Sequence, residues 1–381
     1  MAQDKDLKTP NVPPLRFPGF TDKWKESTIG NVVKIGNGRD YKHLGNGSIP
    51  VFGTGGYMTS VDDYLYDGET VFIGRKGSID KPFYFSGKFW TVDTLFYTYD
   101  FNGVIPKFLY SIFQRINWKK YNEASGVPSL SKATIEKIKF KYPLSPEQDK
   151  ISRLLSLIDE RIATQNKIID NLQSLIKGLN DKFHEEVQGE LVSFSEIGIA
   201  YSGLSGKSGD DFGQGYPFIT YLNVYQNNVI NEDDFGLVTI AANESQHTIS
   251  HGDVLFTLSS ETPDEVGIGS VYLGESDKFY LNSFCFGVSI PNKDRIYPPY
   301  LAHLVSSTKF RKFVYPLAQG STRFNLQKND FMKKKFILPT IEKQRRIATT
   351  LDAINAQLAN EKRLKDLYIA KKEYLLRQIF I

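Results

Sequence analysis

Several residues have types and spacings that could bind a metal or a phosphate, or act as a nucleophile. His247 and His251 stand four residues apart, but no Glu lies between them and no third ligand accompanies them, so a loop is favoured over a metal site. Gly267-Ile268-Gly269 leads into SVYLG, a strand-like run, and not into a helix N-terminus that could hold a phosphate. No Gly-x-x-x-x-Gly-Lys-Ser/Thr occurs, and no His that lies near a Ser or Cys suggests an activated nucleophile. The sequence therefore predicts no metal site, no nucleotide site and no catalytic residue.

A rival interpretation is that the chain is itself a methyltransferase. Tyr297-Pro298-Pro299-Tyr300 is similar to the Asn/Asp-Pro-Pro-aromatic motif of amino-methyltransferases. The residue before the prolines is Tyr297, however, so the amide or carboxylate that would accept a hydrogen bond from the amino group is missing. The two prolines are better explained as the start of a short helix, because proline is well tolerated in a first turn.

Composition narrows the class of protein. A length of 381 residues predicts two or three domains. The net charge of +4 permits a nucleic-acid partner without requiring one. A single cysteine, Cys285, excludes an internal disulfide and any multi-cysteine metal site. The opening MAQDKDLKTPNVPPLRFPGF is charged and proline-rich, unlike a signal peptide or anchor, and no later stretch approaches 18 uncharged apolar residues. We expect a cytoplasmic protein with no membrane partner.

The elements that must position any functional residue occur twice in the chain. YPLSPEQDKISRLLSLID at 142 corresponds to ILPTIEKQRRIATTLDAI, so that Pro143 aligns with Pro339 and Gln148 with Gln344. Further blocks pair in the same order: GETVFIGRKGS with GDVLFTLSSET, FWTVDTLFYTY with FYLNSFCFGVS, PKFLYSIF with PYLAHLVS, and ASGVPSL with AQGSTRF. A period near 190 residues is too long for a solenoid and indicates an internal duplication.

Each globular module is predicted to be β-rich. Short runs of Val, Ile, Phe and Tyr, such as TVFIG, LFYTY and VLFTL, are bounded by Gly, Asp, Asn and Pro. Short helices are expected at 106–116 and from residue 298, each opened by proline. The predicted fold class is α+β, with two β-rich modules at 14–142 and 188–338 alternating with two long helices at 143–187 and 339–381.

Both long segments show the heptad spacing of a coiled coil. The first holds this seam for more than four heptads with one polar break at Gln165, and the second turns polar at Glu361 and Lys365, which leaves the register of the pair open. The residues predicted to form the seam between the two helices are Ile151, Leu155, Ile158, Ile162, Gln165, Ile169, Leu172, Ile347, Leu351, Ile354 and Leu358.

The partner of each long helix is the other helix or its own module. A helix over 147–183 would be about 55 Å long and would overreach a module of roughly 140 residues, so the other helix is favoured. Duplicated helices in one chain pair most economically about a pseudo-two-fold axis, which makes them antiparallel. Apolar residues beyond those of a two-stranded seam suggest a further helical partner.

The tandem plan resembles the specificity subunit of type I restriction–modification enzymes. The resemblance runs from about Pro14 to the C-terminus. It depends on PLRFPGFTDKWKESTIG, GETVFIGRKGSIDKPFYF, ASGVPSLSKATIEKIKFKYPLSPEQDKI and FILPTIEKQRRI, and above all on Pro-x-x-x-x-Gln before an amphipathic helix, present twice. The second module is longer before its GDVLF block, so its loops cannot be mapped one by one from the first.

The resemblance implies a non-catalytic, DNA-binding role. Each module would be a target recognition domain for one half of a bipartite double-stranded DNA sequence. The helices would be spacers that set the distance between half-sites and dock two methyltransferase subunits. Those would methylate adenine with S-adenosylmethionine, and two restriction subunits would cleave DNA with ATP and Mg. No cofactor is expected on this chain. A coiled-coil scaffold whose modules bind protein or carbohydrate is the alternative, and its binding need not weaken steeply with salt.

If DNA is the ligand, side chains with base-edge donors and acceptors should lie on Gly-bounded loops. The loops after Gly74 and Thr257, and those after Gly126 and Gly320, differ between the two copies while the flanking strands agree, as expected if each copy recognises a different sequence. Ordinary solvated loops are the alternative for any single residue. The predicted DNA-binding residues are Arg39, Tyr41, Lys42, Arg75, Lys76, Ser78, Ser129, Ser131, Lys207, Tyr221, Asn223, Ser259, Ser260, Arg323 and Asn325. The same loops also contain His43, Ser125, Lys132, Ser208, Gln226, Glu261, Thr322 and Lys328.

Overall fold

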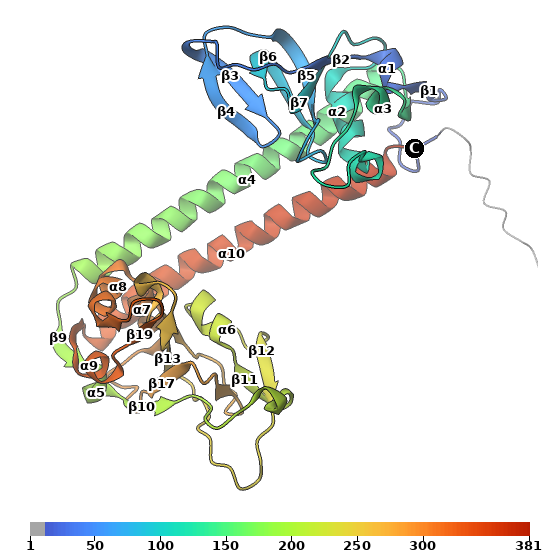
Figure 1. Cartoon of the computed structure of the whole chain (residues 1–381). Helices are drawn as coiled ribbons and strands as arrows, with labels where there is room; N and C mark the ends of the chain where they lie inside the picture. Colours follow the sequence, from blue (N-terminus) through green and yellow to red (C-terminus); the bar gives the residue numbers. More distant parts are fainter. Residues whose placement is uncertain (1–11) are drawn as a thin grey trace, which may run out of the picture. The chain divides into compact units, whose positions relative to one another are not determined.

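The computed structural model describes residues 12–381, and the first residues of the proline-rich opening lie outside this range. The chain divides into two compact units (Figure 1). Unit 1 contains the described residues up to Asn166 together with Arg363–Ile381, and unit 2 contains Lys167–Lys362. Both divisions fall inside the long helices, so each unit combines one globular module with parts of both helices. The domain boundaries predicted at the helix ends remain predictions.

Unit 1 is built on a six-stranded sheet with the order β2-β7-β5-β6-β3-β4, and the pair β1-β8 joins the two ends of the module. Most neighbours are antiparallel, but β3 and β6 are parallel. The elements of this module are β1 (Lys25–Thr28), α1 (Ile29–Val32), β2 (Lys34–Asn37), β3 (Asn46–Gly53), β4 (Gly56–Val61), β5 (Tyr66–Gly74), β6 (Phe83–Thr91), β7 (Leu95–Tyr99), α2 (Pro106–Arg115), a 3-10 turn at Trp118–Tyr121, α3 (Lys132–Glu136) and β8 (Lys139–Tyr142).

Unit 2 repeats this order with a sheet divided into smaller pieces, β10-β17-β13-β15 and β12-β11-β16. Two further small sheets have the orders β14-β19-β18 and β20-β9. The strands are β9 (Glu190–Ser193), β10 (Ile199–Ser202), β11 (Phe212–Ile219), β12 (Phe235–Val238), β13 (Val254–Thr257), β14 (Ser259–Ser260), β15 (Gly269–Val271), β16 (Tyr280–Leu281), β17 (Cys285–Ser289), β18 (Ala318–Gln319), β19 (Phe324–Leu326) and β20 (Lys335–Leu338). The helices of this module are α5 (Phe194–Ile197), α6 (Tyr221–Gln226), α7 (Pro298–Ser306), α8 (Thr308–Val314) and α9 (Lys328–Lys333), with 3-10 turns at Gly209–Asp211, Pro263–Glu265 and Tyr315–Leu317.

The predicted fold class, the internal repeat and the short proline-opened helices are confirmed. The parallel pairing of Phe52 with Thr91 in unit 1 has its counterpart in that of Ile219 with Leu281 in unit 2. The prolines after Tyr297 open α7, which agrees with their interpretation as a helix start. A repeat of this kind arises because the same spacing of apolar and turn residues specifies the same strand order in both copies.

The long helices are α4 (Ser145–Glu185) and α10 (Ile341–Gln378), and within each unit they run antiparallel. In unit 1, the first turns of α4 share a hydrophobic cluster with the last turns of α10, and Lys372 forms an ion pair of 2.5 Å with Asp159. In unit 2, Leu179 and Phe183 pack against the cluster that contains Ile347 and Leu351. The ends of the helices therefore pack on each other and on their module at once.

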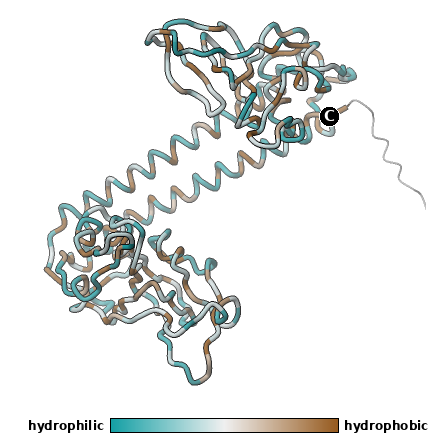
Figure 2. Tube along the Cα trace, viewed as in Figure 1, coloured by the Kyte–Doolittle hydropathy of each residue, from teal (hydrophilic) through white to brown (hydrophobic). Residues whose placement is uncertain are grey.

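Most predicted seam residues are shielded from solvent. Those that are buried in the structure are Ile151, Leu155, Ile158, Gln165, Ile169, Ile347 and Leu351. Those that are half-buried are Ile162, Leu172, Ile354 and Leu358. The hydropathy colouring of Figure 2 shows the alternation of apolar and polar residues along both helices that the heptad spacing requires. No helix among residues 12–381 is long and apolar enough to cross a membrane.

The glutamine of each Pro-x-x-x-x-Gln motif ties its long helix to its module. Gln148 is fully buried, accepts a hydrogen bond from the Ile105 backbone N–H (2.9 Å), and donates to the carbonyl oxygens of Gly103 (2.9 Å) and Pro143 (2.8 Å). One amide group thus satisfies three backbone groups at the junction between β8, α2 and α4. Because β-strand ends and helix starts leave backbone groups unpaired, this junction needs such a side chain.

Gln344 makes the same three bonds in unit 2. It accepts from the Tyr297 N–H (2.8 Å) and donates to the carbonyls of Arg295 (3.0 Å) and Pro339 (2.8 Å). The most specific sequence motif of the chain is therefore a structural clamp that sets where each long helix leaves its module.

Candidate nucleic-acid interface

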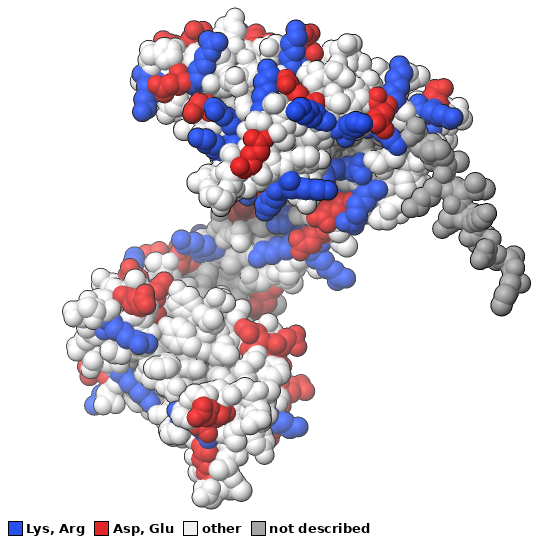
Figure 3. Space-filling view, turned by 45° about the vertical axis from the view of Figure 1, so that its right-hand side comes forward, with Lys and Arg blue, Asp and Glu red and all other residues white. Residues whose placement is uncertain are grey.

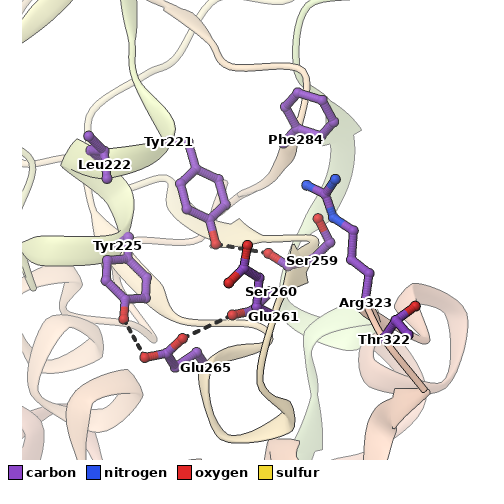
Figure 4. Close-up of a pocket in the computed structure, with 10 residues that line it drawn as sticks. All are labelled: Tyr221, Leu222, Tyr225, Ser259, Ser260, Glu261, Glu265, Phe284, Thr322 and Arg323. Atoms are coloured by element: carbon purple, nitrogen blue, oxygen red, sulfur yellow. Dashed lines mark hydrogen bonds between the residues drawn. The ribbon is translucent and has the colours of Figure 1, made fainter. Parts of the chain in front are cut away.

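The second module contains a cavity of about 890 Å³ that gathers several of the predicted DNA-binding residues (Figure 4). Helix α6 supplies Tyr221, Leu222 and Tyr225 on one side, and the loops before β17 and β19 supply Phe284 and Arg323 on the other, with the strand β14 between them. The complete lining is Tyr221, Leu222, Tyr225, Ser259, Ser260, Glu261, Glu265, Phe284, Thr322 and Arg323. Residues spread over about a hundred positions of the sequence thus meet in one site.

Part of this lining is held by hydrogen bonds within the fold. Tyr221 donates from its hydroxyl to the Ser259 carbonyl (2.8 Å), and burial raises the pKa of Tyr221. Glu265 accepts from the Tyr225 hydroxyl (2.6 Å) and from Ser260 Oγ (3.0 Å), and these bonds, Tyr225 first, lower the pKa of Glu265. The two tyrosine rings are stacked with centroids 6.0 Å apart. These groups form a rigid floor, because their donors and acceptors are already paired.

Arg323 lies at the rim of the cavity on a tight turn. Its guanidinium carbon is 5.5 Å from the centre of the Phe284 ring, a cation–π distance. The turn depends on Gly320, which has a φ of +146°, and a Cβ there would lie only 2.1 Å from the Arg323 carbonyl oxygen. Only glycine avoids this clash, so Gly320 sets the position from which Arg323 projects.

Two residues predicted for this interface have their side chains bound elsewhere in the fold. Asn223 is fully buried, and its amide nitrogen donates to the carbonyls of Asn231 (2.8 Å) and Asp234. Lys207 forms an ion pair of 2.5 Å with Glu244 and is largely shielded from water. Both placements reduce what these side chains can offer DNA, because Asn223 uses both of its amide N–H groups within the fold and Lys207 uses two of its three ammonium donors, on Thr239 and Glu244.

In the first module, backbone hydrogen bonds bring several of the predicted residues together. The Arg75 backbone N–H donates to the Thr94 carbonyl (2.8 Å), and the Leu130 N–H donates to the Arg75 carbonyl (2.9 Å). Lys76 pairs with Ser129 in an isolated β-bridge. The side chain of Arg75 bonds the Asp93 carbonyl through Nη1 (3.2 Å). The loop after β5 and the loop before α3 therefore lie side by side, with Lys76 exposed and Ser78 and Ser129 half-buried.

The same backbone bonds recur in the second module. The Leu258 N–H donates to Phe284 (2.9 Å), and the Leu326 N–H donates to Leu258 (2.8 Å), while Ser259 pairs with Asn325, which is exposed. Arg75 thus corresponds to Leu258, and Arg323 corresponds to Val127 in the first module. The two modules present different side chains on one backbone frame.

The remaining candidates of the first module occupy less uniform positions. The Arg39 N–H donates to the Thr91 carbonyl (2.7 Å), which attaches its loop to the turn that also binds Arg75. The side chains of Arg39 and Lys42 are exposed, and Tyr41 packs against the small cluster around Trp90. Ser131 caps α3 and donates to Glu123 (2.8 Å), so its hydroxyl already has a structural role.

Sequence reasoning did not select Tyr225, Leu222, Glu265 or Phe284. Phe284 is 54% exposed, which is unusual for a large aromatic side chain, and it stands directly before the buried strand β17. Its place in a turn between two apolar runs is the signal that could have identified it. Tyr225 follows Tyr221 by four residues on the same helix, a spacing that places both rings on one face.

Charge is distributed unequally between the modules. Residues 14–142 contain 18 Lys and Arg against 12 Asp and Glu, whereas residues 188–338 contain 12 against 16. Figure 3 shows many Lys and Arg side chains over the first module on the face drawn, and fewer over the second. A polyanion would therefore be attracted more strongly to the first module than to the second.

Other chemistry is not apparent in the described part of the chain. Among residues 12–381, no group of three or more His, Cys, Asp or Glu side chains could hold a metal ion. His247 packs against the Tyr201 ring and His251 faces the carbonyls of Leu273 and Gly274. Cys285 is buried in β17, and burial raises the pKa of its thiol, which makes it a poor nucleophile.

Comparison with known proteins agrees with the repeated architecture. The sequence profile of the family described as "Type I restriction modification DNA specificity domain" matches residues 21–174 and 195–367, one match for each module with part of its helix. The chain therefore belongs to this family of DNA specificity subunits.

Individual relatives span nearly the same architecture. The specificity subunit of the type I restriction enzyme MjaVIII from Methanocaldococcus jannaschii is 25% identical over 79% of this chain and 74% of its own length. The solved S subunit of a type I restriction–modification system from M. genitalium covers 97% of this chain and 99% of its own, with 16% identity and a TM-score of 0.62. A chain from a structure of type I system assembly covers 93% and 96%, with 15% identity and a TM-score of 0.56. These two likenesses show a shared fold.

Proposed function

We propose that this chain recognises a bipartite double-stranded DNA target, one half-site by each globular module, within a type I restriction–modification complex. The observation that carries the proposal is the common backbone frame with different side chains on it, Arg75 and Lys76 in one module and Arg323 and Asn325 in the other. Two modules that recognise different DNA sequences would need the same scaffold with different side chains to hydrogen-bond the base edges.

The long helices would set the distance between the half-sites and dock the modification subunits. In unit 1, apolar side chains that remain exposed on α4 and α10 include Leu157 (54%), Leu367 (59%) and Tyr374 (54%). In unit 2, Leu175 of α4 is 48% exposed. Exposed leucines at helical spacing on helices that already have a seam support a further helical partner.

The partners would supply the chemistry. We propose two methyltransferase subunits that use S-adenosylmethionine to methylate adenine, and two restriction subunits that use ATP and Mg. This chain would contribute recognition and geometry, and its own residues would perform no covalent step. The name of the relative from M. jannaschii, a specificity subunit of a restriction enzyme, supports this division of labour.

The test is methylation mapping with the assembled methylase, expressed in a host that lacks other adenine methylation. Single-molecule sequencing should reveal one motif made of two short half-sites separated by a fixed unspecific gap. Binding to that duplex should also fall steeply between 50 and 200 mM salt, as it does for proteins that neutralise several phosphates. A continuous motif, no motif, or salt-independent binding would count against the proposal and favour a scaffold that binds protein or carbohydrate.

A further inference from the structure

Two of the charged side chains that line the cavity in the second module have no hydrogen-bond or ion-pair partner in the described part of the chain. Tyr221, Tyr225, Ser260 and Glu265 are all bonded within the fold. Within the described residues, the carboxylate of Glu261 and the guanidinium of Arg323 make no hydrogen bond or ion pair with the protein, although both line the same cavity. Opposite charges that line one cavity without pairing leave their full hydrogen-bonding capacity for a ligand.

A carboxylate on a DNA-binding surface is unfavourable unless it contacts a base. Glu261 is exposed and belongs to a module with an excess of acidic residues, so it repels phosphates at close range. Among the base edges in the major groove, cytosine has an N4 amino group that can donate a hydrogen bond to a carboxylate. Adenine also has an amino group, but its N7 acceptor lies beside it and would repel the carboxylate.

Arg323 is suited to the other half of the same base pair. Its guanidinium carbon lies 5.5 Å from the centre of the Phe284 ring, and a cation–π contact of this kind uses none of the N–H groups as hydrogen-bond donors. Two parallel N–H donors match O6 and N7 of guanine, which is the most frequent specific contact of arginine with DNA.

We infer that the half-site recognised by the second module contains a G·C base pair, with Arg323 donating to guanine O6 and N7 and Glu261 accepting from cytosine N4. This inference rests on the proposed function. It goes further by naming the base pair and the two side chains that select it. It also assigns Glu261, an acidic residue, a specific role in recognition.

The experiment maps methylation by the assembled methylase carrying wild-type chain, E261Q, R323A or the control E275Q. E275Q removes the same charge from an exposed site outside the cavity lining. R75A, in the first module, should alter only the half-site recognised by that module, so the half-site that stays unchanged belongs to the second module.

We expect the half-site of the second module to contain a G·C pair in the wild type. R323A should raise methylation at sites with another base there by about tenfold or more relative to the full motif. E261Q should extend the cytosine position to adenine, because glutamine pairs with adenine N6 and N7. E275Q should change nothing.

A second measurement covers the case in which a variant assembles poorly. The wild-type methylase is titrated with duplexes in which each pair of the second half-site is replaced in turn, and one G·C replacement should weaken binding by about tenfold or more. The inference is overturned if the second half-site has no G·C pair, if E261Q and R323A leave the motif unchanged, or if E261Q behaves like E275Q. A wild-type methylase with no bipartite motif would overturn the proposed function as well, and the two failures are therefore distinguishable.

Discussion

Replacing the buried glutamine of either Pro-x-x-x-x-Gln motif should loosen the junction between a module and its long helix. Gln148→Leu keeps the approximate size of the side chain but removes the hydrogen-bond acceptor of the Ile105 N–H and the donor of two carbonyls. Gln344→Leu does the same to Tyr297, Arg295 and Pro339. Because the three bonds are equivalent in the two units, the two substitutions should have similar effects.

The magnitude follows from the burial of the three groups that lose their partners. The Pro143 carbonyl bond is buried, and leaving such a group unsatisfied costs about 1–3 kcal/mol. The other two bonds are partly buried, and each should contribute about 1 kcal/mol. The sum is about 3–5 kcal/mol per unit, which lowers the Tm by roughly 6–20 °C for a unit of this size.

Hydrogen exchange provides the local assay. Q148L should raise the exchange rate of the Ile105 amide and leave Tyr297 protected, and Q344L should do the reverse. The exposed neighbours supply controls, D149N and K343Q, which should shift the melting temperature by less than about 2 °C. Unchanged protection at Ile105 in Q148L, or a loss no larger than in D149N, would refute the role of the glutamine clamp.

Three further perturbations test other parts of the molecule. Arg75→Ala or Arg323→Ala should cost about 1–3 kcal/mol on cognate duplex at fixed salt, and an equal loss on scrambled duplex would instead indicate a phosphate contact. Inserting four residues near Gln165 should lengthen α4 by about 6 Å with a rotation of about 40°, so mapping should reveal a changed gap and unchanged half-sites; the opposite result would exclude the spacer role. Burial lowers the pKa of His184 from 6.5 to about 4, so the unfolded chain binds the proton first as pH falls, and stability should decrease by about 2 kcal/mol from pH 7 to pH 5. His184→Gln, which cannot protonate, should flatten this dependence in thermal melts.

Local patterns were sufficient to predict the architecture. The heptad spacing from Ile151 to Leu172 and its copy from Ile347 to Leu358 predicted two long helices, and the structure contains α4 and α10 at those places. The run LFYTY predicted a strand that coincides with β7 at Leu95–Tyr99. Such elements can be predicted from the sequence because the spacing of apolar residues within a short segment indicates a helix or a strand. The pairing of the module ends, β1 with β8 and β9 with β20, joins residues more than a hundred positions apart and had no local signal.

The sequence by itself determined that two similar modules alternate with two long helices, and it located the loops that vary between them. Only the tertiary structure decided which polar side chains on those loops remain available to a ligand. Asn223 and Lys207 had suitable chemistry, but the fold uses their donors for its own carbonyls and for Glu244. Glu261 and Arg323 are left unpaired at the edge of the cavity. Availability depends on every partner that folding brings near, and those partners come from distant parts of the chain.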